Sequence, residues 1–205
     1  MIIDTKNKFI FVAIAKTACT SIHARLGGLH GRVACKQCNH PPNRAPLPYI
    51  YHMFLKDIVR NHPETKNFYK FAFVRNPYDR LVSAYHDFKH NSEHKNWAHP
   101  IYKYNSFRDF VMDFENSPCV NFIHLQPQFD YLETEGQINI DFIGRFENLR
   151  EDFRKIEKEL SLPHIDLPVT RVSKHKDYHH YYDEETKLIV RRIYKNDFEI
   201  FGYEK

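Results

Sequence analysis

The residues best suited to chemistry follow the apolar run 9–14. Lys16 comes two residues after this run, and the hydroxyl side chains of Thr17, Thr20 and Ser21 come next. A lysine beside hydroxyl groups and a turn of backbone N–H donors matches the oxygens of a phosphate or sulfate group. The sequence therefore predicts that this segment binds an anion.

A second cation, Arg75, directly follows another apolar run, 71–74, and Ser83 lies eight residues further on. The residues after Arg75 are typical of a helix start, with a capping side chain, a proline at the first helical position and an acid at the third. They are Asn76, Pro77 and Asp79. Because a helix N-terminus presents N–H groups and a positive dipole end, this segment also suits an anion.

Taken singly, Lys16 or Arg75 fits an ordinary solvent-facing cation at a strand end as well as it fits a ligand contact. Two such cations, each with hydroxyls or a helix cap beside it, favour an anion site instead. The Walker A pattern GxxxxGK[ST] is absent, and no glycine lies between residues 1 and 26. A P-loop kinase or NTPase is therefore disfavoured.

The elements that must position these cations alternate between strands and helices. Apolar runs predict strands at 9–14, 71–74 and 141–144, and apolar residues at helical spacing follow the first two. Further helices are predicted at 106–114, capped by Ser106, from a cap at Asn148 onward, and at 184–201. This order indicates an α/β domain with a central, mainly parallel sheet, in which ligands bind beyond the carboxyl ends of the strands.

Length and composition predict a single globular domain, 1–205. The chain has 17 Phe, 13 Tyr and 6 Gly, and 30 Lys and Arg against 26 Asp and Glu give a net charge of +4. That charge is too small to indicate nucleic-acid binding, although it fits a small anion or an acidic polymer. No apolar run approaches the roughly 18 residues of a membrane span.

Cysteine and histidine spacing gives one weak metal signal. Cys35, Cys38 and His40, in CKQCNH, form half of a possible zinc site, but no second pair of ligands follows at a usable spacing. We therefore expect no metal.

Several motifs resemble one enzyme family. AKTACTSI, residues 15–22, resembles the PKTGGTSI 5′-phosphosulfate loop of sulfotransferases, and FAFVRNPYDRLVSAY, residues 71–85, is close to their 3′-phosphate motif. The similarity is to the family 2 carbohydrate sulfotransferases, the Golgi heparan and chondroitin sulfotransferases and their soluble bacterial relatives. It continues through YHMFLKDIV, HLQPQFDYL, DFIGRFENLREDF and YYDEETKLIVRRIYKNDFEIFGY, and so covers nearly the whole chain.

The resemblance implies a P-loop-like, three-layer fold and the donor 3′-phosphoadenosine 5′-phosphosulfate (PAPS), with 3′-phosphoadenosine 5′-phosphate (PAP) as product. Lys16 would contact the phosphosulfate bridge and act as a catalytic residue by stabilising the leaving phosphate. The phosphosulfate oxygens would be cradled by Lys16, Thr17, Ala18, Cys19, Thr20 and Ser21. Arg75 and Ser83 would hold the 3′-phosphate. The segment that closes over the nucleotide would contain Ser173, Lys174, His175 and Tyr178.

The resemblance also implies a catalytic base. His52, in YHMF, stands where related 2-O-sulfotransferases have a histidine proposed for this role. The accepting hydroxyl must lose a proton, and a neutral histidine suits that task near pH 7. His124, in HLQPQ, is a second candidate that would otherwise shape the acceptor site or serve the structure.

Two residues depart from the family loop. Ala15 replaces the usual proline, and Cys19 stands where glycine is common. We expect a positive φ at Cys19 to be strained and its side chain to crowd the sulfate. A thiol at a helix N-terminus would also have a lowered pKa, but no base or second cysteine is adjacent in the sequence, so we do not expect catalysis by Cys19.

The sequence thus predicts a PAPS-dependent sulfotransferase that sulfates a hydroxyl of an acceptor, with a carbohydrate expected. The alternatives are a nucleotide kinase-like phosphotransferase and an inactive nucleotide-binding relative. We expect no nucleic-acid partner, no membrane span and a cytoplasmic location, or the Golgi lumen if the chain is the catalytic part of a longer enzyme. The acceptor's identity and the oligomeric state have no signature in the sequence.

Overall fold

The computed structural model describes residues 1–26, 32–33, 52–90, 100–169 and 175–204. The chain divides into two compact units. Unit 1 comprises Met1–Val74 and Tyr131–Thr170, and unit 2 comprises Arg75–Asp130 and Arg171–Lys205. Each unit is described by itself below, and the single domain expected from length and composition stays a prediction.

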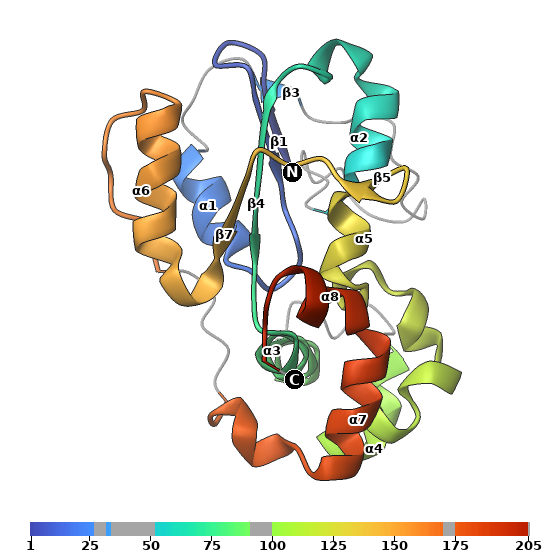
Figure 1. Ribbon diagram of the computed structural model, residues 1–205. Coiled ribbons are helices and arrows are strands. Elements are labelled where there is room, and N and C mark those ends of the chain that lie inside the picture. Colours follow the sequence, from blue (N-terminus) through green and yellow to red (C-terminus); the bar gives the residue numbers. More distant parts are fainter. Residues whose placement is uncertain (27–31, 34–51, 91–99, 170–174, 205) are drawn as a thin grey trace. The chain divides into compact units, whose positions relative to one another are not determined.

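Unit 1 is built on a mixed sheet that has five strands within the described residues, in the order β3-β1-β2-β4-β7 (Figure 1). β2 pairs with β4, and β4 with β7, in parallel, whereas β1 runs antiparallel to both β2 and β3. The bounds are β1 Ile2–Asp4, β2 Phe9–Val12, β3 Arg32–Val33, β4 Tyr69–Val74 and β7 Phe142–Arg145, with a separate ribbon of β5 Glu133–Thr134 and β6 Gln137–Ile138. The predicted α/β class is confirmed. The sheet is mixed, because both pairings of β1, with β2 and with β3, are antiparallel.

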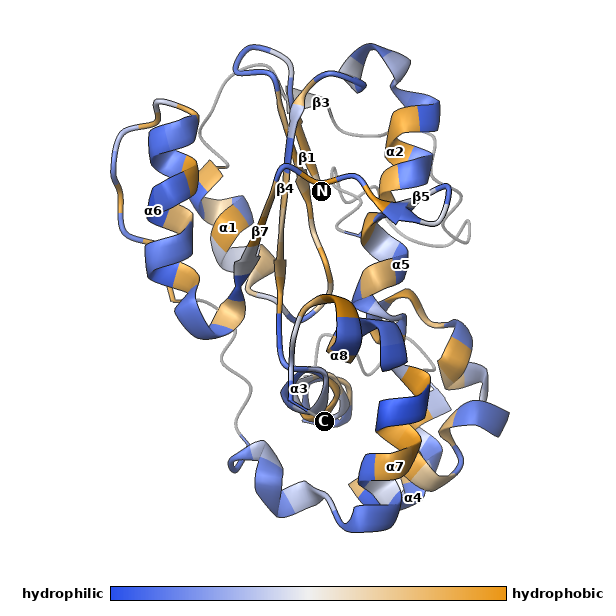
Figure 2. Cartoon of the chain, in the orientation of Figure 1, coloured by the Kyte–Doolittle hydropathy of each residue, from blue (hydrophilic) through white to orange (hydrophobic). Residues whose placement is uncertain are grey.

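Helices cover both faces of this sheet. They are α1 Cys19–Leu26, α2 Leu55–Asn61 and α6 Leu149–Glu159, while α5 Gln128–Leu132 spans the boundary between the units. α1 and α6 lie on one face and α2 on the other (Figure 1). Alternate strand residues such as Phe9, Phe11 and Phe71 pack with Ile22 of α1 and Phe153 of α6. β2 is apolar along its whole length and β4 along most of it, whereas the helices each show hydrophilic and hydrophobic sides (Figure 2).

Unit 2 packs α3 Pro77–His90, α4 Phe107–Met112, α7 Glu184–Ile193 and α8 Lys195–Ile200 around an aromatic core. Two predicted helix starts are confirmed. The Asn76 side chain accepts a hydrogen bond from the N–H of Tyr78 (2.9 Å), and Ser106 accepts one from the N–H of Asp109 (3.1 Å). Short 3₁₀ helices connect the elements of both units: Pro63–Thr65, Pro100–Lys103, Phe114–Asn116, Pro118–Asn121, Ile123–Leu125, Phe146–Asn148 and Tyr178–Tyr181.

Two helix predictions need correction. The helix predicted at 184–201 is broken at Tyr194, which leaves helical dihedrals (φ −105°, ψ 31°) while its hydroxyl donates to the carbonyl of Leu125 (2.7 Å). The Asn148 side chain does not cap α6, because its amide donates to Asp152 (3.3 Å) and a 3₁₀ turn leads into the helix. The predicted strand 141–144 is displaced by one residue, to β7.

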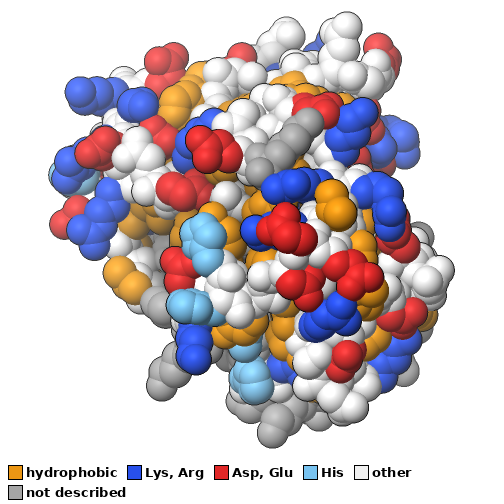
Figure 3. All heavy atoms as spheres, turned by 60° about the horizontal axis from the view of Figure 1, so that its bottom comes forward, with side chains coloured by type: hydrophobic (Ala, Val, Ile, Leu, Met, Phe, Trp, Pro, Cys, Tyr) orange, Lys and Arg blue, Asp and Glu red, His pale blue; other side chains and the backbone are white. Residues whose placement is uncertain are grey.

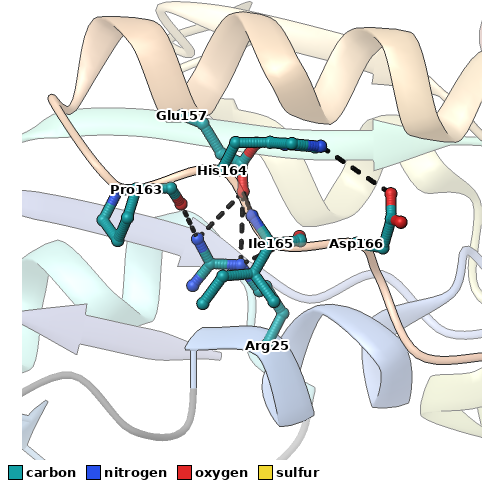
Figure 4. A network of polar contacts seen from close by, with 6 residues as sticks. All are labelled: Arg25, Glu157, Pro163, His164, Ile165 and Asp166. Carbon is teal, nitrogen blue, oxygen red and sulfur yellow. Dashed lines mark hydrogen bonds and ion pairs between the residues drawn. The ribbon is translucent and has the colours of Figure 1, made fainter.

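A buried ion pair ties α1 to α6, and further hydrogen bonds extend this network to the segment that follows α6 (Figure 4). Arg25 donates to Glu157 through Nη2 (2.9 Å) and Nε (3.2 Å), and the two residues are 8% and 3% exposed. Glu157 also accepts from the N–H of Ile165 (3.2 Å) and contacts Nδ1 of His164 (2.7 Å), while Arg25 donates to the carbonyl of Pro163. Since α1 begins at the predicted anion loop, this network helps to hold that loop's helix on the sheet.

We expect Glu157→Gln to lower the free energy of unfolding by about 2 kcal/mol, because it leaves the Arg25 charge buried without its counter-ion. Burial alone would raise the pKa of Glu157, but hydrogen bonds from His164, Ile165 and Arg25 outweigh it and lower that pKa. The unfolded chain therefore takes up this proton at a higher pH than the folded chain. The stabilisation is present above the ordinary carboxyl pKa and is lost as pH falls through the lowered one.

Urea unfolding of both proteins at pH 7 and in acid measures this effect. The difference between parent and variant should shrink in acid. The exposed neighbour Glu159 on the same helix supplies a control variant, Glu159→Gln, with little expected change. Equal stabilities for the Glu157 and Glu159 variants at pH 7 would contradict the prediction.

Candidate active site

The parallel strands of unit 1 end together at one edge of the sheet. Val12 of β2 pairs with Ala72 of β4, and Val74 pairs with Arg145 of β7. The segment after β2 carries Lys16, and Arg75 follows β4 directly. Both predicted anion segments therefore leave the sheet where ligands of parallel α/β sheets bind.

The loop between β2 and α1 has an unusual backbone. Lys16 and Ala18 have left-handed φ angles of 67° and 63°, and Thr17 between them does not. Such alternation turns successive N–H groups toward one side, the arrangement of anion-binding nests. The Thr17 hydroxyl is buried and donates to the carbonyl of Ile14 (2.9 Å), so it fastens the loop. Only its backbone N–H would contribute to a cradle.

α1 begins directly behind this loop. The N–H of Ile22 donates to the carbonyl of Ala18 (3.1 Å), which starts the helical ladder. The first turn, with Cys19, Thr20 and Ser21, presents its N–H groups at the helix's positive end. These residues come from the same unit as Lys16 and continue the loop's row of backbone donors.

The left-handed φ considered for Cys19 lies at its neighbour, and the pKa of the Cys19 thiol is raised where a helix N-terminus alone would lower it. The left-handed residue is Ala18, one position earlier, whereas Cys19 is the first residue of α1. Burial raises the pKa of the Cys19 thiol, and the nearby charges of the N-terminus and Lys16 only partly oppose this. At 9% exposure the thiol is a packing group and is not an activated nucleophile.

His52 is held against the end of β2. Its Nδ1 lies 2.7 Å from the carbonyl oxygen of Ala13. Because a carbonyl only accepts, Nδ1 must carry the hydrogen, and the neutral ring then has its lone pair on Nε2. Ala13 lies three residues before Lys16, a stretch of at most about 11 Å. The predicted base and the predicted cation are thus anchored to one short segment of unit 1.

Arg75, in unit 2, is fixed through both its backbone and its side chain. Its N–H donates to Oε1 of Gln128 and its carbonyl accepts from Nε2 of the same side chain, both at 2.8 Å. Its Nε donates to Asp79 (2.8 Å), and the residue is 7% exposed. Asp79 and the buried Ser83 are four residues apart on α3 and share one side of that helix. The guanidinium and the Ser83 hydroxyl therefore lie along the same side of the α3 start.

The segment predicted to close over the nucleotide contacts α3 at two places. Tyr178 stacks on Tyr78 in the first helical turn (centroids 6.2 Å apart, planes at 8°). His175 stacks on His86 (5.5 Å, 28°), eight residues further along α3 than Tyr78, about 12 Å by helix rise. The structure thus separates these two residues, and Ser173 and Lys174 lie outside the described residues.

His86 and His124 have different surroundings. Burial, with the charges of His175 and His90, lowers the pKa of His86 to about 4, so the His86 ring is neutral at pH 7. The ring of His124, the second candidate for the base, packs edge-on against Phe88 in the core of unit 2 (5.1 Å). That position supports a structural role.

The basic residues of α7 do not form a broad cationic surface. Lys187 pairs with Glu184 (2.7 Å), Arg192 pairs with Glu115, and Arg191 donates to the hydroxyl of Tyr78 (2.8 Å). Acidic and basic side chains are interspersed on the face shown in Figure 3. The basic residues of α7 therefore fit a solvated surface of mixed charge better than a basic groove.

The profile described as the sulfotransferase family matches residues 1–204. The chain belongs to the sulfotransferase family. It is 28% identical over 200 residues to carbohydrate sulfotransferase 10 of Xenopus laevis, covering 81% of this chain and 55% of the relative.

Two human relatives show the same pattern. Carbohydrate sulfotransferase 10 of Homo sapiens is 30% identical over 172 residues, covering 68% of this chain and 48% of the relative. Carbohydrate sulfotransferase 9 of Homo sapiens is 26% identical over 226 residues, covering 95% of this chain and 47% of the relative. The sulfotransferase chain thus spans about half the length of these curated relatives. No solved structure matches it significantly.

Two kinds of feature are absent from the part of the chain that the structure describes. Across the ranges the structure describes, no helix is both long and apolar enough to cross a membrane. Within the same ranges, no cluster of three His, Cys, Asp or Glu side chains is placed to hold a metal ion. Cys35, Cys38 and His40 lie outside those ranges.

Sequence reasoning missed the residues that position the site. Gln128 fastens the backbone of Arg75 from 53 positions away, and Asp79, expected only as a helix-start acid, holds the guanidinium. The carbonyl of Ala13 fixes the His52 ring. Because every residue has a backbone carbonyl, the residue type at position 13 could not have indicated this contact. Gln128 had one signal, its place in the HLQPQFDYL motif shared with other sulfotransferases.

The loop backbone leads to a paired prediction about stability. We expect Ala18→Gly to raise the free energy of unfolding by about 0.5–1 kcal/mol, because glycine relieves the left-handed conformation. Cys19→Gly should lower it by about 2 kcal/mol, because it removes a buried side chain and puts glycine into a helix. Urea unfolding of both variants measures the two signs. A stabilising Cys19→Gly would mean that the strain lies at Cys19 after all.

Proposed function

We propose that this sulfotransferase transfers a sulfuryl group from PAPS to a hydroxyl of a carbohydrate. The single observation that carries the proposal is that the left-handed loop of Lys16 and the tethered ring of His52 belong to the end of one strand, β2. An anion cradle and a base are the two groups that this reaction requires. We also assign unit 1 to the P-loop-like class, since its strand–loop–helix order places a helix N-terminus behind the cradle.

The donor presents two anionic ends, and the chain has a suitable segment for each. The loop of Lys16 and the first turn of α1 would hold the phosphosulfate with backbone N–H groups and one cation. Arg75 and Ser83 would hold the 3′-phosphate through a charged fork and a hydroxyl. His175 and Tyr178 are assigned, with Ser173 and Lys174, to the segment that covers the nucleotide.

The reaction follows from these assignments. The acceptor oxygen attacks sulfur in line, and the bond between sulfur and the bridging oxygen breaks with its electron pair left on the phosphate of PAP. Lys16 balances the charge that develops on that oxygen. The hydroxyl proton passes to Nε2 of His52, while Nδ1 keeps its hydrogen bond to Ala13.

A carbohydrate acceptor is proposed because the curated relatives are carbohydrate sulfotransferases. On α7, Lys187 and Arg192 are paired with acidic side chains and do not form a cationic strip. The acceptor class proposed is therefore a carbohydrate, on the likeness to these relatives.

The test combines binding with transfer. Calorimetric titration with PAP should show one site, and incubation with sulfur-labelled PAPS and a panel of saccharides should label one class of acceptor. PAP binding without transfer to any acceptor would support an inactive nucleotide-binding relative. Absence of PAP binding, or phosphoryl transfer from ATP, would overturn the proposal.

A further inference from the structure

We propose that Gln128 is a positioning residue that sets the preference of this chain for a 3′-phosphorylated nucleotide by fixing Arg75. The inference rests on the proposed function and adds a residue that touches no ligand. Its basis is the amide of Gln128, which pairs with both backbone groups of Arg75. The Gln128 side chain is fully buried, so water does not compete for these bonds.

Gln128 is itself held in place by the C-terminal part of unit 2. The N–H groups of Gln128 and Phe129 donate to the two carboxylate oxygens of Asp197 (2.9 and 2.8 Å). Asp197 lies on α8 and is fully buried. The glutamine therefore has a fixed backbone from which its side chain reaches Arg75.

The residues just before Gln128 are fixed as well. Arg80, on α3 and 2% exposed, donates to the carbonyls of Gln126 (2.7 Å) and His124 (3.4 Å). Its guanidinium also lies over the ring of Tyr194 (5.2 Å). The segment 124–129 is thus held by α3 on one side and by α8 on the other.

The consequence concerns the angle at which Arg75 enters its site. Asp79 holds Nε of the guanidinium (2.8 Å), and the position of the Arg75 backbone sets the point from which the side chain leaves the chain. Loss of the Gln128 amide would leave a buried N–H and a buried carbonyl without these partners, and the backbone would shift to recover them. A shift there would weaken contacts to the 3′-phosphate without touching those of the loop of Lys16.

The experiment compares PAP with adenosine 5′-phosphate, which lacks only the 3′-phosphate. Calorimetry gives the ratio of their dissociation constants for the parent, Gln128→Leu, Arg75→Ala and the double variant. We expect Gln128→Leu to reduce the ratio about tenfold or more, with little change for adenosine 5′-phosphate. On the Arg75→Ala background the same substitution should change the ratio no further, because both act on one contact.

Gln128→Glu is a conservative variant of nearly the same shape. A protonated carboxyl can accept from the N–H of Arg75 and donate to its carbonyl, as the amide does, whereas an ionised carboxylate would repel that carbonyl. Preference for PAP should therefore rise toward the parent value as pH is lowered in this variant and stay low in Gln128→Leu. Gln126→Leu, two positions away with a side chain bonded only to Val120, is the matched control.

The outcomes separate this inference from the proposed function. A parent that does not prefer PAP overturns the proposed function and this inference with it. A preference that survives Gln128→Leu, or an equal loss of both ligands, overturns the inference alone. If Gln128→Leu does not fold, as judged by thermal unfolding, the pH dependence of the ratio in Gln128→Glu decides, and a flat profile would refute the positioning role.

Discussion

Lys16→Ala is expected to lower kcat for sulfuryl transfer by about a hundredfold to a thousandfold. The negative charge on the bridging oxygen is larger in the transition state than in bound PAPS, so the lysine stabilises the transition state more than the ground state. The dissociation constant of PAP should therefore rise by a smaller factor than kcat falls. Initial rates at saturating donor and calorimetry with PAP measure the two quantities.

A second lysine in unit 1 provides the control. Lys6 is exposed in the turn between β1 and β2, and Lys6→Ala removes the same charge from the chain. Its kcat should match that of the parent. If both variants lose activity equally, overall charge is responsible, and if neither does, Lys16 has no part in the chemistry.

His52→Asn is expected to lower kcat by about a hundredfold to ten-thousandfold, the range for loss of a positioned general base. The asparagine amide can still donate to the Ala13 carbonyl that now accepts from Nδ1. The loop should therefore keep its shape, and PAP should bind almost as tightly as to the parent. Loss of turnover with retained nucleotide binding would distinguish a base from a residue that only packs.

The dependence of rate on pH gives a further check on His52. A protonated imidazole cannot accept the hydroxyl proton, so the parent should slow in acid while His52→Asn stays slow throughout. His62, at the end of α2, bonds to Glu64 through its ring (3.3 Å), and His62→Asn is a matched control. An unchanged pH profile in His52→Asn would assign the base to another group.

Local signals predicted most of the elements near the site. The continuous apolar run at 9–14 marked β2, although the strand ends at Val12 because the chain must then turn into its left-handed loop. Pro77 and Ser106 marked the starts of α3 and α4, since capping depends on neighbours within three or four residues. Lys16 and Arg75 were likewise predicted from short-range pattern, because each comes within two residues of the end of an apolar run.

Features set by distant contacts were not predictable. β1 has three residues and is defined by its pairing with β2, which no short apolar run reveals. The break at Tyr194 accompanies contacts of its side chain with Leu125 and Arg80, some seventy and more than one hundred positions away. Gln128 bonds to the backbone N–H and carbonyl of Arg75, which nearly every residue type has. The arginine side chain therefore gives no signal in the sequence that Gln128 is its partner.

The left-handed backbone at Lys16 implies a trade-off between the thermal stability of the chain and the rate of the proposed reaction. A lysine held at a φ of 67° costs the folded chain free energy that a glycine would recover. Selection for heat resistance alone would therefore favour replacing Lys16, the residue to which the proposed reaction assigns the leaving-group charge, and a library screened without substrate would lose that amine. In the proposed mechanism the amine and the tight turn are needed at the same position, so heat-resistant variants of this chain have to be sought elsewhere in the fold.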